Sequence, residues 1–349
     1  MECTVILQRI LKSAVVLLAS LAAMPACTTT TAAPGSPGYI DHPEARAFID
    51  EMAARHDFSR AELTAIFSQA QRREDILELM RRPAEKQLAW HEYRKIFLTQ
   101  SRIDGGIAYW NQHADILSKA ERELGVDAQI IVAIIGVETR YGGNTGSHRV
   151  LDALATLAFD YPPRSKFFRG ELEQYLVLAH EENIDLLSTK GSYAGAMGYG
   201  QFIPSSYRHY AVDFDQDGKR DLWNSPMDII GSVANYIHEH GWELGATVTL
   251  PASVSGDGYN AVLKQGLKPH TAMKQLQQAG ITPATPLPDK TLAALITLEN
   301  KDGPGYWLAL NNFYVITRYN RSPLYAMAVY QLSEEIRQAR ALSLQARHD

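Results

Sequence analysis

The chain has 349 residues, of which 46% are hydrophobic and 21% are charged, and its formal net charge is −5 at pH 7. This composition is that of an ordinary globular protein, long enough to bury a large core in more than one lobe. A mildly acidic chain gives no reason to expect nucleic acid as a partner, and we predict none.

The first 26 residues have the features of an export signal. Arg9 and Lys12 precede an apolar run over Ser13–Met24, which is too short to span a bilayer by itself. Cys27 follows small residues in a context that resembles a bacterial lipobox, and the chain's other cysteine lies within the signal. A single thiol cannot form an internal disulfide. We predict lipidation at Cys27 and a periplasmic protein anchored to the outer membrane, with simple signal cleavage as the alternative.

A low-complexity stretch over 27–40 predicts a flexible tether. Helical periodicity follows within 41–100 and predicts an N-terminal helical lobe. Its last helix contains three aromatic residues at helical spacing, Trp90, Tyr93 and Phe97. A stripe of this kind belongs more often to a core than to a binding surface.

The segment 127–143 is the most informative part of the chain. Asp127 is a good helix N-cap, and the residues that follow are almost wholly apolar up to Glu138. Apolar surroundings and the negative end of the helix both disfavour an ionised carboxyl group, so we expect a raised pKa for Glu138, as a general acid requires. The alternative is that Glu138 lies at the surface or pairs with Arg140.

Gly191–Tyr207 combines glycines with aromatic residues. No Gly-Lys-Ser/Thr follows, so the segment is not a phosphate loop. Glycines that let the backbone approach a ligand, among rings, hydroxyls and amides, suit a sugar-binding cleft. Close packing of helices through small residues is the alternative.

Asp213–Asn224 matches the calcium-loop pattern at positions one, three, five and six. Position twelve does not match, because Asn224 replaces the usual glutamate, and Asp228 is the residue that could close the shell. Three alternating carboxylates repel one another without a cation. We therefore predict one structural Ca²⁺ and no organic cofactor, with an Asx-rich turn without an ion as the alternative. No zinc-ligand spacing of histidines occurs.

Short β-type runs separated by Gly and Pro predict a small β-rich lobe over 246–305, and a terminal helix follows within 306–349. The predicted fold class is α+β, mainly α.

Together these residues resemble the membrane-bound lytic transglycosylase B family, which cleaves peptidoglycan on a lysozyme-like fold. The resemblance covers most of Pro43–Leu342 and is densest at Val137–Gly142, Gly191–Tyr207 and Arg318–Ser322. It implies a lysozyme-like catalytic core over 101–245, to which the helical and β-rich lobes are added, and a C-terminal segment that completes the cleft.

The resemblance also implies roles for individual residues. Glu138 falls on the family's catalytic acid. The matching substrate-binding residues are Ser192, Gln201, Tyr236, Tyr319, Asn320 and Tyr325, with Tyr93 and Arg164 at outer positions. The implied calcium ligands are Asp213, Asp215, Asp217, Lys219 and Asp228, in a loop with one extra residue near Ser225.

Ordinary glycosidases need two carboxyl groups, and the nearest candidates for a second one here are Asp152 and Asp160, whose surroundings are less apolar. We therefore expect Glu138 to act alone, as acid toward the MurNAc–GlcNAc bond and then as base toward the muramyl C6 hydroxyl, which closes a 1,6-anhydro ring. Two alternatives remain: a lysozyme-type muramidase that uses water, and a non-catalytic, calcium-stabilised cell-wall scaffold. We expect a monomer that binds peptidoglycan glycan strands, and the sequence leaves partners among wall-synthesis proteins open.

Overall fold

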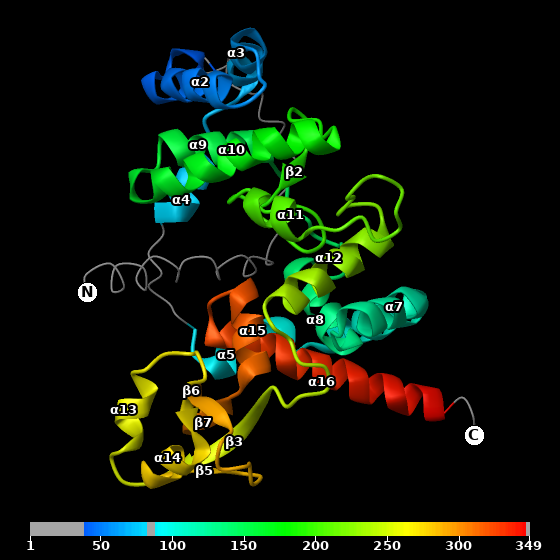
Figure 1. The fold of residues 1–349 in the computed structure, drawn as a ribbon, viewed down its shortest axis with the longest axis vertical. Coiled ribbons are helices and arrows are strands. Elements are labelled where there is room, and N and C mark those ends of the chain that lie inside the picture. Colours follow the sequence, from blue (N-terminus) through cyan, green and yellow to red (C-terminus); the bar gives the residue numbers. More distant parts are fainter. Residues whose placement is uncertain (1–37, 82–87, 347–349) are drawn as a thin grey trace, which may run out of the picture. The chain divides into compact units, whose positions relative to one another are not determined.

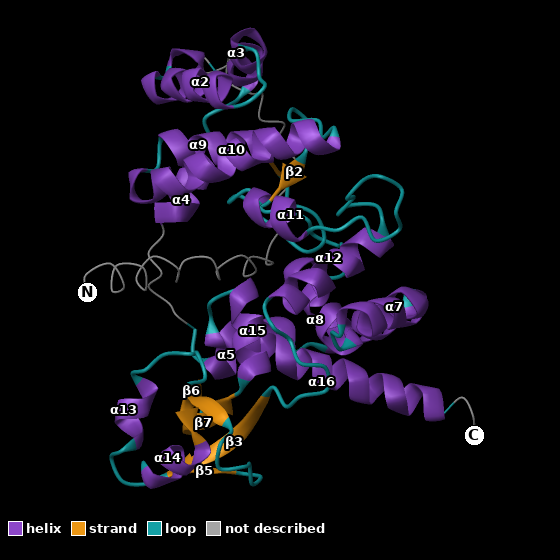
Figure 2. Cartoon of the chain, viewed as in Figure 1, coloured by secondary structure: helices purple, strands orange, loops and turns teal. Residues whose placement is uncertain are grey.

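The structure is a computed structural model that describes residues 38–81 and 88–346, and its elements are shown in Figures 1 and 2. The predicted export signal, Cys27 and most of the tether lie outside the described residues. No helix in the described part is long and apolar enough to cross a membrane. Its residues fall into two compact units, a first unit of 88–141 and 230–346 and a second unit of 38–81 and 142–229. The six segments predicted from the sequence stay a prediction.

The second unit is mainly helical. Its helices are η2 (Tyr39–Asp41), α2 (Pro43–Arg55), α3 (Arg60–Gln69), α4 (Glu74–Arg81), α9 (Val150–Phe159), η3 (Pro162–Arg164), α10 (Ser165–Glu182) and α11 (Pro204–Tyr210). The short strands β1 (His148–Arg149) and β2 (Lys190–Gly191) pair antiparallel. All ten residues of α9 are buried, because its sequence is apolar on nearly every side, and this helix forms the centre of the unit.

The first unit combines helices with a sheet. Its helices are α5 (Trp90–Phe97), α6 (Gln100–Gln112), α7 (Ala114–Leu124), α8 (Ala128–Thr139), α13 (Tyr259–Leu263), α14 (Met273–Gln278), α15 (Asn311–Tyr319) and α16 (Pro323–Gln345). Helix α12 (Pro226–Glu239) begins in the second unit and belongs to the first unit from residue 230. The strands are β3 (Thr249–Val254), β4 (Thr271–Ala272), β5 (Ile281–Pro283), β6 (Leu292–Asn300) and β7 (Gly303–Ala309), in the order β4-β6-β7-β3-β5.

The sheet has a small core of its own. Every neighbouring pair of strands is antiparallel, and β6 and β7 form a hairpin in which Asn300 pairs with Gly303. Alternate residues of these strands, such as Leu295 and Leu308, pack with Met273 and Leu276 of α14. The prediction of a mainly helical α+β fold with a small β-rich lobe is confirmed.

Helix α8 forms where the apolar segment predicted it. Asp127 stands at its N-cap position, but its carboxylate does not cap the helix. That carboxylate instead accepts hydrogen bonds from the Trp242 indole at 2.8 Å and from the Gly245 N–H at 3.1 Å. The expected capping role of Asp127 is therefore wrong: the side chain joins the start of α8 to the loop after α12.

Candidate active site

Glu138 occupies the last turn of α8, in the first unit. Within residues 130–139 every residue is buried except Glu138, which is half-buried. The Tyr325 hydroxyl, from the first turn of α16, donates a hydrogen bond to Glu138 Oε1 at 2.6 Å. Surrounding protein thus encloses the carboxyl group while part of the side chain stays open to an incoming ligand.

Burial raises the pKa of Glu138 to about 7 from an ordinary 4.5, because an ionised carboxylate loses hydration there. The hydrogen bond from Tyr325 acts in the opposite direction, since it stabilises the carboxylate, but it is the smaller effect. A carboxyl group with this pKa is protonated in a large fraction of molecules at neutral pH. It can therefore donate a proton and later take one back.

Three tyrosines from three helices interact electrostatically with the Glu138 carboxylate. They are Tyr93 of α5, Tyr319 of α15 and Tyr325 of α16. Burial first, and then the Glu138 charge, raises the pKa of each phenol above its usual range. The phenols therefore stay neutral. Glu138 is surrounded by aromatic faces and uncharged hydroxyl groups, and within the described residues it forms no ion pair with a cation.

The alternative in which Glu138 pairs with Arg140 is not found in the described residues. Arg140 lies just past the end of α8, in the left-handed conformation with φ 52°, and it is exposed. The aromatic stripe on α5 belongs to the core, as its spacing favoured, since Trp90, Tyr93 and Phe97 are all buried.

Two further predicted residues, Tyr236 and Asn320, belong to the same unit, and Tyr236 contacts this cluster. The ring of Tyr236, in α12, meets Tyr319 edge-on at 4.7 Å between centroids, and its hydroxyl donates to the Arg318 carbonyl at 2.7 Å. Asn320 follows Tyr319 directly and leaves α15 in an extended conformation. The first unit thus brings together Glu138 and four of the predicted substrate-binding residues, Tyr93, Tyr236, Tyr319 and Tyr325, and Asn320 is the residue after Tyr319.

Replacing Tyr325 with phenylalanine tests the short hydrogen bond to Glu138. We expect the rate of glycan cleavage to fall about tenfold or more, because a bond to a carboxylate positions it and stabilises its charge. Loss of the donor also raises the pKa of Glu138 further, so the decline of activity at high pH should move to higher pH. Activity measured from pH 5 to 9 checks both effects. An unchanged pH profile with an unchanged rate would contradict the assigned contact.

The other predicted substrate-binding residues, Ser192, Gln201 and Arg164, belong to the second unit. The Ser192 hydroxyl accepts the N–H groups of Ala194 and Ala196 at 3.2 and 3.0 Å. Gln201 has φ 50°, and its amide donates to the carbonyls of Thr145 and Gly198 at 3.1 and 2.9 Å. These side chains hold the turns of the glycine-rich segment in place.

Glycines of the same segment are needed for close packing. An added Cβ would lie 2.3 Å from the Ala196 carbonyl oxygen at Gly191 and 2.5 Å from the Leu222 carbonyl oxygen at Gly198, where φ is 67°. At these two positions the backbone approaches protein rather than a ligand, but the neighbouring backbone belongs to a turn and a loop and not to the packed helices of the alternative. Arg164, at the end of η3, places its guanidinium 4.4 Å from the Phe167 ring.

Asp152 and Asp160, the candidates for a second catalytic carboxylate, are engaged elsewhere in the second unit. Asp152 accepts from the Arg149 side chain at 2.6 Å and from the Gln71 N–H at 2.8 Å. Asp160 accepts from the Tyr39 hydroxyl at 2.6 Å. Both carboxylates join α9 to the preceding helical segments.

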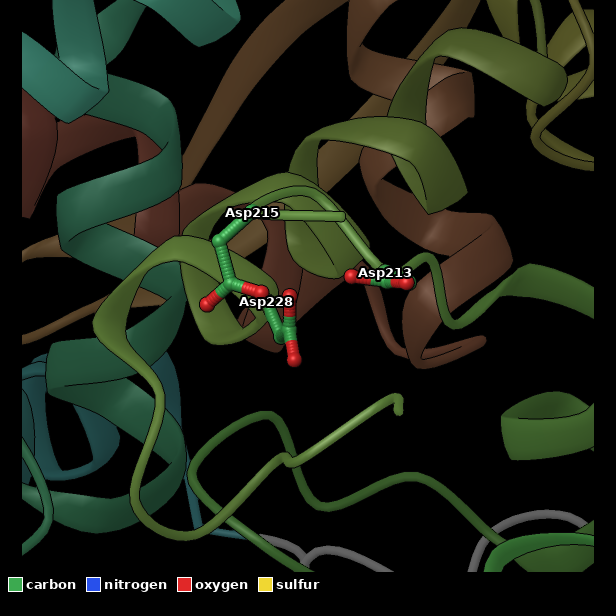
Figure 3. Close-up of side chains that lie close together, drawn as sticks. All are labelled: Asp213, Asp215 and Asp228. Carbon is green, nitrogen blue, oxygen red and sulfur yellow. The ribbon is translucent and has the colours of Figure 1, made fainter. Parts of the chain in front are cut away.

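The predicted calcium loop brings three carboxylates together in the second unit. Asp213, Asp215 and Asp228, whose side chains are drawn in Figure 3, each offer an oxygen. These three oxygens lie within 4.8 Å of one another. Carboxylate oxygens are the donors that Ca²⁺ prefers, so the donor set fits that ion. Asp217 and Lys219 lie in the same loop but outside this group, and Asp217 Oδ1 accepts the Lys219 N–H at 2.9 Å.

Asp228 closes the loop, in the place of the usual glutamate. It is 1% exposed, and its two oxygens accept the N–H groups of Phe214 and Asp221, each at 2.8 Å. Ser225, near which the loop has its extra residue, donates to Asp215 Oδ2 at 2.7 Å. The sequence did not predict this hydrogen bond, because a hydroxyl donor to a ligand is not part of the loop pattern.

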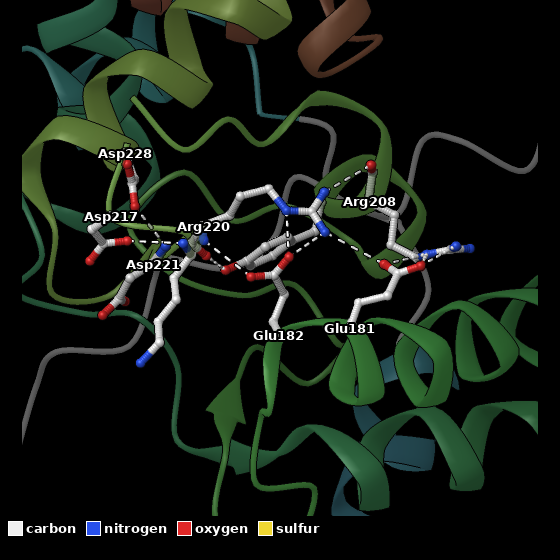
Figure 4. A network of polar contacts seen from close by, with 9 residues as sticks. Glu181, Glu182, Arg208, Asp217, Arg220, Asp221 and Asp228 are labelled. Carbon is white, nitrogen blue, oxygen red and sulfur yellow. Dashed lines mark hydrogen bonds and ion pairs between the residues drawn. The ribbon is translucent and has the colours of Figure 1, made fainter. Parts of the chain in front are cut away.

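An ion-pair network attaches the loop to the end of α10. The Arg220 side chain donates through Nε to Glu182 Oε1 at 2.5 Å, and its backbone N–H donates to Glu182 Oε2 at 3.1 Å. Figure 4 shows this network. Arg208 of α11 donates two hydrogen bonds to the Glu181 carboxylate, from Nη2 to Oε1 at 2.6 Å and from Nε to Oε2 at 3.0 Å. Arg220 therefore joins the loop that carries Asp213 to Asp228 to the end of α10, and Arg208 joins α11 to the same end.

The chain matches known proteins over most of its length. The model of the Transglycosylase SLT domain matches residues 41–334. Membrane-bound lytic murein transglycosylase B of Escherichia coli (strain K12) is 44% identical over 351 residues, which cover 93% of this chain and 96% of that protein.

Two solved structures are also similar. Escherichia coli lytic transglycosylase Slt35 in complex with calcium has a TM-score of 0.81 and 47% identity, over 88% of this chain and 96% of that chain. Pseudomonas aeruginosa SltB3 in complex with NAG-NAM-pentapeptide has a TM-score of 0.75 and 32% identity, over 84% and 79% of the two chains. The predicted family and the lysozyme-like fold class are confirmed. The chain therefore belongs to the Transglycosylase SLT domain family, the family of the lytic murein transglycosylases.

Proposed function

We propose that this lytic transglycosylase cleaves the MurNAc-β-1,4-GlcNAc bond of peptidoglycan with Glu138 as its single acid and base. The observation that carries the proposal is the half-buried Glu138 carboxyl group, with a pKa of about 7 and a 2.6 Å hydrogen bond from Tyr325. A relative, SltB3, has been solved with NAG-NAM-pentapeptide, which is a fragment of the proposed polymer.

In the first step the protonated Glu138 donates its proton to the glycosidic oxygen. The bond between C1 of MurNAc and that oxygen breaks, its electron pair goes to the oxygen, and the GlcNAc part leaves with a hydroxyl group. General acid help of this kind contributes about 10²–10⁴-fold in rate. The Tyr325 hydroxyl then stabilises the carboxylate that forms.

In the second step the Glu138 carboxylate takes the proton from the C6 hydroxyl of the same MurNAc. Oxygen O6 bonds to C1 and closes the 1,6-anhydro ring, while Glu138 returns to its protonated form. No water is consumed, and no second carboxylate is needed, because the nucleophile is tethered to the reacting carbon. The tyrosines around Glu138 supply aromatic faces and neutral hydroxyls suited to a sugar.

The three carboxylates of Asp213, Asp215 and Asp228 would hold one Ca²⁺. The family resemblance alone adds Asp217 and Lys219 of the same loop as further ligands. The ion would neutralise the repulsion between these carboxylates and so stabilise the second unit. Slt35, a relative of this chain, has been solved in complex with calcium. The proposed role is structural, because the carboxylates belong to a loop tied to α10 and not to the helix that carries Glu138.

A membrane-anchored periplasmic location is part of the same proposal. The relative from Escherichia coli is named membrane-bound. In this chain the anchor would be a lipid on Cys27, which follows the predicted export signal. A tether between that cysteine and η2 would let the enzyme reach glycan strands from the outer membrane.

The products of cell-wall digestion test the proposed reaction. Purified sacculi digested in ¹⁸O-labelled water should release fragments with 1,6-anhydro-MurNAc ends that contain no label, as read by mass spectrometry. Labelled reducing ends would instead identify a lysozyme-type muramidase. Binding to sacculi without any soluble fragment would identify a non-catalytic scaffold.

A further inference from the structure

The backbone is strained at two successive positions, two and three residues after Glu138. Arg140 has φ 52° and Tyr141 has φ 59°, so both lie in the left-handed region that residues other than glycine usually avoid. Their N–H groups reach back to the last turn of α8: Arg140 donates to Gly136 at 3.1 Å and Tyr141 to Ile135 at 3.4 Å. This geometry persists only where neighbouring groups hold it.

The Tyr141 side chain fills a slot between α6 and α8. The slot has glycine on both helices, and a Cβ added at Gly105, Gly106 or Gly136 would lie 2.9, 2.7 or 2.5 Å from the Tyr141 ring or hydroxyl. Glycine inside a helix lowers the stability of that helix. The glycines of the slot therefore destabilise α6 and α8, but they leave room for the Tyr141 ring. The sequence offers a signal for it in the pair Gly105-Gly106 within a helical stretch.

Two more contacts fix the ring within the slot. The Tyr141 hydroxyl donates to the Arg102 carbonyl of α6 at 2.8 Å, and the ring stacks on Tyr109 at 5.6 Å between centroids. The ring therefore ties the residue three positions after Glu138 to a neighbouring helix. The hydrogen bond to the Glu138 carboxyl group comes from another element, α16, and the tyrosines of α5 and α15 that interact with its charge also lie outside α6 and α8.

We propose that Tyr141 is a positioning residue for Glu138. Its ring is fixed in the glycine slot and holds the strained backbone at the end of α8. The last turn of α8, which carries the Glu138 carboxyl group, is thereby fixed as well. The inference rests on the proposed role of Glu138 as the acid. Tyr141 does not touch the reacting atoms, and it acts through the backbone of α8.

Kinetics of two Tyr141 variants test the inference. Tyr141→Leu removes the ring and should lower kcat about 10²-fold with little change in KM, because a small displacement of a catalytic group has an effect of that size. Tyr141→Phe keeps the ring and should restore kcat to within about fivefold of the wild type. Tyr39→Phe is the matched control, since it removes another tyrosine hydroxyl bond, the 2.6 Å bond to Asp160, and should lower the melting temperature without lowering kcat.

A double-mutant cycle separates positioning from general instability. Gly136→Ala alone should lower kcat, because its methyl group meets the far end of the Tyr141 ring at 2.5 Å. In the Tyr141→Leu background that ring end is absent, so Gly136→Ala should change kcat by no more than about twofold. Multiplicative losses, or a Tyr141→Leu kcat equal to that of the wild type, would overturn the inference. Wild-type activity of Glu138→Gln would instead reject the proposed function of Glu138, and this result can be distinguished from a failure of the Tyr141 variants to lower kcat.

Discussion

Glu138→Gln is expected to lower the rate of glycan-strand cleavage by about 10²–10⁴-fold, or more, without unfolding the protein. Glutamine keeps the size of the side chain and can still accept the Tyr325 hydrogen bond, which is 2.6 Å long in the wild type. It cannot donate a proton to a leaving oxygen at the required rate, and it cannot take one from the C6 hydroxyl. Both proposed steps therefore fail at once.

The stability of this variant has a predicted dependence on pH. The pKa of Glu138 is raised to about 7 in the folded protein, compared with 4.5 for an ordinary glutamate. Between these two values the unfolded chain loses the proton and the folded protein keeps it, so wild-type stability falls as the pH rises. Glutamine has no such titration. The melting temperature of Glu138→Gln relative to the wild type should therefore increase from pH 4.5 to pH 7.

Release of soluble fragments from sacculi measures the activity, and thermal melts at several pH values measure the stability. The matched control is Glu335→Gln, because Glu335 is exposed on α16 and should be replaceable without loss of activity. Wild-type activity in Glu138→Gln would show that Glu138 is not the general acid. A melting difference that does not change with pH would show that the pKa of Glu138 is ordinary.

Asp228→Ala is expected to abolish the stabilisation of the protein by Ca²⁺. In the wild type, Ca²⁺ at about 100 times its dissociation constant should add about 2.7 kcal/mol to the free energy of unfolding, because the ion binds only the folded loop. The variant loses a ligand and also leaves the N–H groups of Phe214 and Asp221 without their acceptor. A buried unsatisfied donor costs about 1–3 kcal/mol, so the variant should melt at lower temperature even without calcium.

Thermal melts with calcium and with a chelator measure both parts of this prediction. Asp57→Ala is the matched control, because Asp57 is an exposed aspartate of the same unit and should leave the calcium response intact. A wild type that melts at the same temperature with calcium and with chelator would favour the turn without an ion. If calcium raised the melting temperature of Asp228→Ala as much as that of the wild type, Asp228 would not be a calcium ligand.

The sequence predicted the parts of the fold that depend on local pattern. Helix α8 followed from an apolar run that ends at Glu138, and the β-rich lobe followed from short runs between Gly and Pro. The calcium loop followed from alternating aspartates, of which Asp213 and Asp215 meet Asp228 as expected from the resemblance.

Contacts between distant segments could not be predicted in the same way. The bond from Tyr325 to Glu138 joins residues 187 positions apart, and only the family resemblance pointed to Tyr325. Asp127 was expected to cap α8, but the Trp242 indole competes for the carboxylate and binds it instead. The slot that receives Tyr141 needs glycines from two helices to face one ring, and helical periodicity does not indicate which helices are neighbours.

The most direct test of the central claim is an NMR titration of the Glu138 carboxyl group. Protein labelled with ¹³C at glutamate carboxyl positions would be titrated from pH 4 to 9, and the Glu138 signal would be assigned by its absence in Glu138→Gln. We expect an inflection near pH 7, since burial raises the pKa of Glu138 to about 7. An inflection near 4.5, the ordinary value for glutamate, would mean that the group is ionised at neutral pH and would contradict its role as the proton donor.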